Sequence, residues 1–169
     1  GVESSGMLCA SDELGFGGSH EGILKLPDSF ELGANLLDLL WDPVLEVSLT
    51  PNLGHCMSVL GIARELATLL NLPVKVPKSS YPTEKPSTAS AKIQDSDNCH
   101  RYCLKTVDGI EIKDSPFWLQ HQLLLCGMNP INNIVDITNW VMLEMGQPMH
   151  AFDHDKISGN ELVVQGTKE

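Results

Sequence analysis

The sequence predicts an α+β protein made of small mixed domains, and three patterns lead to this prediction. Apolar residues recur at helical spacing over residues 58–70, 115–126 and 132–145. Apolar and polar residues alternate, as in half-buried strands, over residues 44–49, 101–113 and 161–165. Residues 76–97, between these groups, are rich in Pro, Ser, Thr and Lys. They hold too few large apolar side chains to offset chain entropy by burial, so we interpret them as a linker.

The first half of the chain predicts short strands followed by helices. Glycine-rich turns separate alternating segments at residues 7–9 and 23–24, which we interpret as strands at the rim of a small β domain. Residues 36–41 predict one or two helical turns. The strand predicted over residues 44–49 ends before Pro51, because proline lacks a donor for the strand ladder. Ser58 is a suitable N-cap for the helix that follows.

The second half predicts a hairpin, two helices and two strands. Asp108-Gly109 separates two alternating runs, which is a strong hairpin signal. We expect Ser115 to cap a helix that has Pro116 at its first position and stops at Gly127, and we expect a second helix to end at Gly146. Two further strands are expected, with a turn of Ser158-Gly159-Asn160 between them. These strands cover residues 149–152 and 161–165.

Composition excludes several classes of function. Eleven basic and 22 acidic residues give a net charge of −11, the wrong sign for a domain that neutralises many phosphates. The apolar runs are far shorter than the roughly 20 residues of a membrane-spanning helix. Five cysteines, without a Cys-x-x-Cys pair, favour a reducing cytoplasm. Cys99, His100 and Cys103 fall short of a tetrahedral zinc set, so no metal site is predicted.

Polar side chains crowd into one stretch near two predicted helix ends and a strand. Such residues could bind a polar ligand, or they could cap helices and satisfy backbone groups, and spacing alone leaves both alternatives open. The residues are Asn132, Asn133, Asp136, Asn139, His150, Asp153, His154 and Asp155.

The same stretch carries a family resemblance. Residues 132–144 (NNIVDITNWVMLE) and 146–153 (GQPMHAFD) closely resemble the signature of the phenylalanyl-tRNA synthetase β subunit of bacterial type. Two further segments resemble this family in the same order: residues 1–9 (GVESSGMLC) with 13–15 (ELG), and residues 46–52 (EVSLTPN) with 58–65 (SVLGIARE). The matches extend over almost the whole chain.

The resemblance implies a domain organisation. Residues 1–42 would be the C-terminal tail of an oligonucleotide-binding-fold (OB-fold) domain that binds tRNA, and residues 43–75 an α/β module from the second half of the N-terminal domain. Residues 98–169 would be the first part of a mixed α+β editing domain. Because the chain starts at Gly1 without an initiator Met, we expect it to be part of a longer protein.

The resemblance also implies a function for the longer protein. The family joins phenylalanine to its tRNA with ATP and magnesium, in an α2β2 assembly whose synthetic site lies in the α subunit. We therefore expect no aminoacylation residue and no cofactor in this chain, and no DNA or membrane partner. The β subunit adds hydrolysis of tyrosine misattached to the phenylalanine tRNA. The alternative function is a noncatalytic protein-interaction module.

By matched motif position, His150 and Asn139 correspond to residues of the editing pocket, where they would bind the terminal adenosine of the tRNA and position water. The alternative for His150 is a buried histidine bonded to nearby backbone. This chain departs from the family pattern at Asn129, where an arginine is common, and at Leu53 and His55, which replace an arginine and an aspartate. A glutamate expected to bind the tyrosine hydroxyl would follow Glu169, so we expect no editing by this chain alone.

Overall fold

The computed structural model describes residues 1–3, 5–16, 20, 22–78 and 86–167, which form two compact units. Unit 1 consists of Gly1–Val74 and Ile112–Met149, and unit 2 of Lys75–Glu111 and His150–Glu169. Each unit is therefore built from two separate stretches of chain. A mixture of helix and strand confirms the coarse α+β prediction. The domain boundaries at residues 42, 75 and 97 stay predictions.

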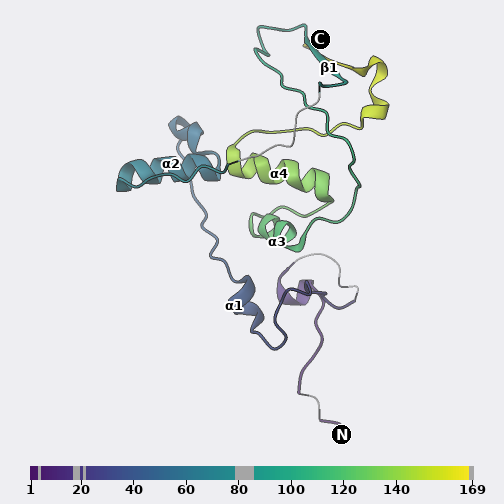
Figure 1. The fold of residues 1–169 in the computed structure, drawn as a ribbon. Coiled ribbons are helices and arrows are strands. Elements are labelled where there is room, and N and C mark those ends of the chain that lie inside the picture. The colour runs from purple at the N-terminus through teal and green to yellow at the C-terminus, as the bar shows by residue number, and fades with distance from the viewer. Residues whose placement is uncertain (4, 17–19, 21, 79–85, 168–169) are drawn as a thin grey trace. The chain divides into compact units, whose positions relative to one another are not determined.

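Unit 1 contains all four α-helices of the described residues (Figure 1). The helix predicted at residues 36–41 is confirmed as a short one, and the three longer ones begin and end close to the predicted positions. The helices are α1 (Leu36–Leu40), α2 (Val59–Leu70), α3 (Phe117–Leu125) and α4 (Asn133–Met145).

Local capping explains the limits of α2 and α4. The hydroxyl oxygen of Ser58 accepts a hydrogen bond of 3.0 Å from the Gly61 amide, as expected of an N-cap, and α2 ends at Asn71 in the left-handed conformation. The side-chain oxygen of Asn132 accepts hydrogen bonds from two amides in the first turn of α4, and that helix ends at Gly146 with φ of 78°. Both helices are thus delimited by their own sequence.

The start of α3 differs from the prediction, whereas its end does not. Ser115 does not cap the helix, because its hydroxyl donates instead to the Asp136 carboxylate in α4 at 2.5 Å, and Pro116 takes the N-cap position. At the other end, the amides of Gly127 and Met128 donate to the carbonyls of Leu124 and Leu123. These two bonds form a Schellman motif, which requires a left-handed residue, here Gly127.

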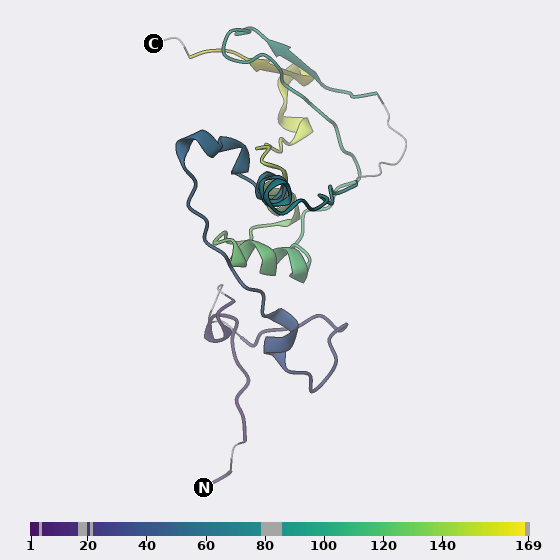
Figure 2. The ribbon, with the colours of Figure 1, turned by 90° about the vertical axis from the view of Figure 1, so that its left-hand side faces the viewer.

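The core of unit 1 lies where α4 packs against α3 and α2 (Figures 1 and 2). Leu119 and Leu123 of α3 and Leu60 of α2 are buried. The C-terminal end of α4 contacts the N-terminal end of α2, because a Cβ on Gly146 would lie only 3.2 Å from the Cβ of Ser58. Among the described residues, no helix has both the length and the apolar character that crossing a membrane requires.

Unit 2 is organised around a two-stranded parallel sheet. Strand β1 (Ser90–Ile93) pairs with β2 (Glu161–Val164), in a register that sets Ser90 opposite Glu161. The turn predicted before β2 is confirmed as a 3₁₀ helix, Ser158–Asn160. Strand β1 lies inside the stretch predicted as a linker. Its partner is remote in the sequence, so the local composition could not reveal it.

The strands predicted in residues 7–9, 23–24 and 44–49 are wrong. The first two segments are joined by one hydrogen bond of 2.9 Å, from the Leu24 amide to the Cys9 carbonyl, without forming a ladder. Residues 44–49 form no strand, and Leu45 is 84% exposed. Alternation identifies a segment able to pair, but a strand requires a neighbouring strand.

The predicted hairpin over residues 101–113 and the predicted strand at residues 149–152 are also wrong, because no strand forms in either range. Gly109 does adopt a turn conformation, with φ of 72°. A turn signal alone does not hold two strands together, since an isolated hairpin is marginal without a third strand or other packing.

Candidate functional site

Four of the eight polar residues in the crowded C-terminal stretch accept hydrogen bonds from backbone amides. Asp136 is completely buried and accepts hydrogen bonds from the Ser115 hydroxyl and, at 2.8 Å, from the Ile131 amide. The Asn133 side chain accepts from the Lys113 amide at 3.3 Å, and Asp153 caps the 3₁₀ helix His154–Lys156. For these residues, and for Asn132, the capping alternative left open by the sequence is the one that the structure supports.

The two predicted editing residues lie in different units. Asn139 is half-buried on α4 in unit 1, and His150 is exposed at the start of the second stretch of unit 2. The ring centroid of His150 lies 6.2 Å from that of Phe152, with the rings tilted at 44°. His150 is therefore not the buried histidine of the alternative interpretation. That Asn139 and His150 share one opening stays a prediction.

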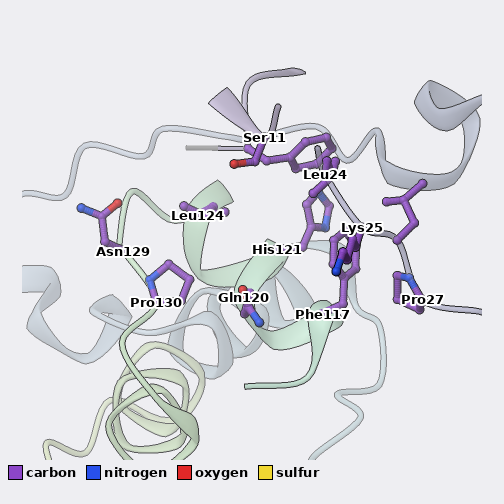
Figure 3. Close-up of a pocket in the computed structure, with 12 residues that line it drawn as sticks. Ser11, Leu24, Lys25, Pro27, Phe117, Gln120, His121, Leu124, Asn129 and Pro130 are labelled. Atoms are coloured by element: carbon purple, nitrogen blue, oxygen red, sulfur yellow. The ribbon is translucent and has the colours of Figure 1, made fainter. Parts of the chain in front are cut away.

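Asn129, which stands where the family commonly has an arginine, lines a pocket of about 690 Å³ in unit 1 (Figure 3). One wall is aromatic, because the rings of Phe117 and His121 stack with centroids 6.2 Å apart and Phe16 lies 5.7 Å from His121. Lys25 adds a positive charge to the lining. This combination could accommodate a flat or anionic group.

The sequence did not predict a second cluster, which consists of three side chains with metal-binding donor atoms. Single donor atoms of His55, Cys56 and Glu65 all lie within 4.8 Å of one another in unit 1. His55 Nε2 lies 3.2 Å from Glu65 Oε2, and burial and the nearby Glu65 carboxylate together raise the pKa of the Cys56 thiol. The sequence feature that could have indicated this cluster is the adjacent His55-Cys56 pair, which is followed by a capped helix that carries the Glu65 carboxylate.

Two further groups have shifted pKa values. Burial raises the pKa of the Cys126 thiol, beside the end of α3. In unit 2, the side-chain amide and the backbone amide of Asn98 donate hydrogen bonds to the Asp95 carboxylate, at 2.9 Å and 3.2 Å, and these bonds lower the pKa of Asp95.

Comparison with known proteins tests the resemblance. Residues 98–169 match the family model of the B3/4 domain. A phenylalanine–tRNA ligase beta subunit from Desulfotalea psychrophila is 45% identical over 172 residues, covering 100% of this chain and 21% of the relative. The beta subunit from Dehalococcoides mccartyi is 43% identical over 175 residues, with 100% and 21% covered, and that from Fusobacterium nucleatum is 44% identical over 173 residues, with 99% and 22% covered.

These matches extend over the whole chain but not over the whole of each relative. The chain spans about a fifth of the length of the curated relatives it matches. The resemblance drawn from the sequence is therefore confirmed: the whole chain is similar to a segment of curated phenylalanine–tRNA ligase beta subunits.

Proposed function

We propose that this chain acts as part of the β subunit of a phenylalanine–tRNA ligase, which attaches phenylalanine to its tRNA with ATP and magnesium. The observation that carries the proposal is the identity of 45% over the whole chain to a curated beta subunit. The partners would be the phenylalanine tRNA and the α subunit of an α2β2 enzyme, which would hold the synthetic site. The enzyme would work in the cytoplasm.

Within that enzyme, the chain would contribute to editing and to tRNA binding. An apolar pocket shaped for phenylalanine rejects an analogue that only adds a hydroxyl by about a hundredfold, so misattached tyrosine must be hydrolysed elsewhere. The match of residues 98–169 to the B3/4 domain supports assigning this hydrolysis to the C-terminal part of the chain. Residues 1–42 would contribute tRNA contacts as the tail of an OB-fold domain.

Asn139 and His150 are the residues that we assign to the editing pocket, on the strength of their motif positions. Asn139 is fixed on α4, a helix capped at both ends, and a carboxamide can both donate and accept hydrogen bonds to a nucleoside. His150 is exposed and thus accessible to a ligand. A neutral imidazole can accept a proton from water and donate to a sugar hydroxyl near neutral pH.

The test uses the intact enzyme with both subunits and substitutes His150→Ala. We expect hydrolysis of tyrosyl-tRNA to slow by at least tenfold, because a positioned imidazole contributes on the order of 10²–10⁴ to proton transfer. Attachment of phenylalanine should remain nearly unchanged. His100→Ala is a matched control, since His100 is also an exposed histidine of unit 2.

The expected pattern is specific to an editing residue. Loss of tyrosyl-tRNA hydrolysis in His150→Ala, but not in His100→Ala, would support the assignment. Asn139→Ala should lose this hydrolysis as His150→Ala does. If both rates are unchanged in His150→Ala, the site assignment is wrong. If the intact enzyme attaches no phenylalanine at all, the proposed function itself fails.

A further inference from the structure

The cluster of His55, Cys56 and Glu65 brings three different kinds of metal-binding atom together. An imidazole nitrogen, a thiol sulfur and a carboxylate oxygen lie within 4.8 Å of one another, one from each residue. The three side chains come from a 3₁₀ helix, Pro51–Cys56, and from the middle of α2, which packs against it (Figure 1). The cluster thus connects two elements.

The fold holds these elements at a fixed distance. A Cβ on Gly61 would collide with the carbonyl oxygen of His55 and lie 3.0 Å from the Cα of Cys56, so the backbone of the 3₁₀ helix rests directly on α2. Cys56 is 1% exposed at this contact. Glu65 follows Gly61 by one helical turn and therefore stands on the same side of α2.

The imidazole and carboxylate donor atoms already have nearly the spacing of ligands in a tetrahedral zinc site. With bonds of roughly 2.0–2.1 Å to nitrogen and oxygen and 2.3 Å to sulfur, the ligand atoms of such a site lie roughly 3.3–3.6 Å apart. The nitrogen of His55 and the oxygen of Glu65 are already 3.2 Å apart, and no pair exceeds 4.8 Å. Side-chain rotations that move the donor atoms by little more than 1 Å would therefore bring all three to the spacing of zinc ligands.

The types of donor atom decide which ion the cluster would take. Magnesium and calcium prefer sites made of oxygen alone, whereas a thiolate and an imidazole select zinc and its soft or borderline neighbours. The side chains of His55 and Glu65 are 57% and 43% exposed, so solvent can reach the ion and supply a fourth ligand. Three protein ligands and one water form the coordination shell of zinc sites that keep one position open to solvent.

We propose that His55, Cys56 and Glu65 bind a zinc-class divalent ion, with water in the fourth position, and that the ion fastens the 3₁₀ helix Pro51–Cys56 to α2. Binding releases the thiol proton of Cys56 to solvent, and the thiolate and the carboxylate then neutralise the ion's two positive charges. The site is independent of the editing function proposed above. Without an ion, His55 and Glu65 form an exposed hydrogen bond beside a core cysteine.

The test titrates Co²⁺, a spectroscopic substitute for zinc, into the full-length protein that contains this chain. We expect one equivalent to produce a thiolate-to-cobalt charge-transfer band, which zinc abolishes by displacement. The band should be absent from the difference spectrum of Cys56→Ser. His55→Ala and Glu65→Gln should each weaken Co²⁺ binding by at least tenfold.

Two controls keep the result interpretable. Cys126→Ser removes another thiol of unit 1 and should leave the band unchanged. If Cys56→Ser fails to fold, Glu65→Gln still tests the site, because that side chain is half-exposed and the substitution preserves its shape. The proposal is overturned if the wild-type protein binds no stoichiometric Co²⁺, or if the band survives in Glu65→Gln with unchanged affinity.

Discussion

Removing the buried carboxylate of Asp136 should destabilise unit 1 more than any surface change. Asp136 is completely buried and receives hydrogen bonds from the Ser115 hydroxyl at 2.5 Å and the Ile131 amide at 2.8 Å, so it ties α4 to the start of α3 and to the loop between these helices. A typical hydrogen bond contributes about 0.5–1.5 kcal/mol, and a buried donor left without an acceptor costs about 1–3 kcal/mol. Asp136→Ala also leaves both donors without their acceptor.

We expect Asp136→Ala to lower the free energy of opening of α3 and α4 by about 3 kcal/mol, which corresponds to roughly hundredfold faster amide exchange. Hydrogen exchange measured by mass spectrometry on the full-length protein reports this directly. Asp136→Asn keeps an acceptor for the Ile131 amide and should cost about 1 kcal/mol. Asp155→Ala, at a side chain 98% exposed in unit 2, is the control. Exchange no faster in Asp136→Ala than in Asp155→Ala would refute the reasoning.

Two further predictions concern a close backbone contact and a shifted carboxylate. Gly61→Ala should destabilise the packing of α2 by about 1–3 kcal/mol, because the added Cβ collides with the His55 carbonyl, whereas Gly54→Ala meets open space and should be nearly neutral in thermal unfolding. Asn98→Ala should raise the pKa of Asp95 towards its ordinary value. A carboxyl whose pKa is lower in the folded state than in the unfolded state stabilises the fold at pH values above its unfolded-state pKa. This stabilisation is lost as the pH falls through the folded-state pKa. The variant should therefore be less stable than the wild type at neutral pH but equally stable in strong acid. An NMR titration of the carboxyl carbon checks the shift, and an unchanged midpoint would contradict it.

The helices could be predicted from the sequence because their limits are encoded locally. Ser58, Asn132, Gly127 and Gly146 each act within one turn of their own helix, so their effect does not depend on remote partners. Ser115 shows where local reasoning fails. Its hydroxyl had a suitable local role as a cap but bonds Asp136 of α4 instead, an acceptor that the sequence alone could not place beside it.

The strand predicted over residues 161–165 is confirmed as β2, but the other predicted strands do not form, because pairing depends on partners remote in the sequence. Ser90–Ile93 lies in a stretch of low apolar content and yet forms β1, whereas the clear alternation of residues 44–49 forms no strand. The cluster of His55, Cys56 and Glu65 was missed for a related reason, since a tight loop-to-helix contact at Gly61 assembles it. The assignments of Asn139 and His150 come from motif resemblance alone.

The parallel pairing of β1 with β2 constrains the order in which the protein assembles. Strand β1 can pair only after β2 has been synthesised, and all residues between them, including α3 and α4, leave the ribosome before β2 does. Closing so long a loop carries an entropic cost that local helix formation does not, so pairings of this kind form slowly. The nascent helices of unit 1 can therefore be in place before the sheet of unit 2 exists, and β1 spends that interval as an unpaired segment open to chaperones or misdirected partners.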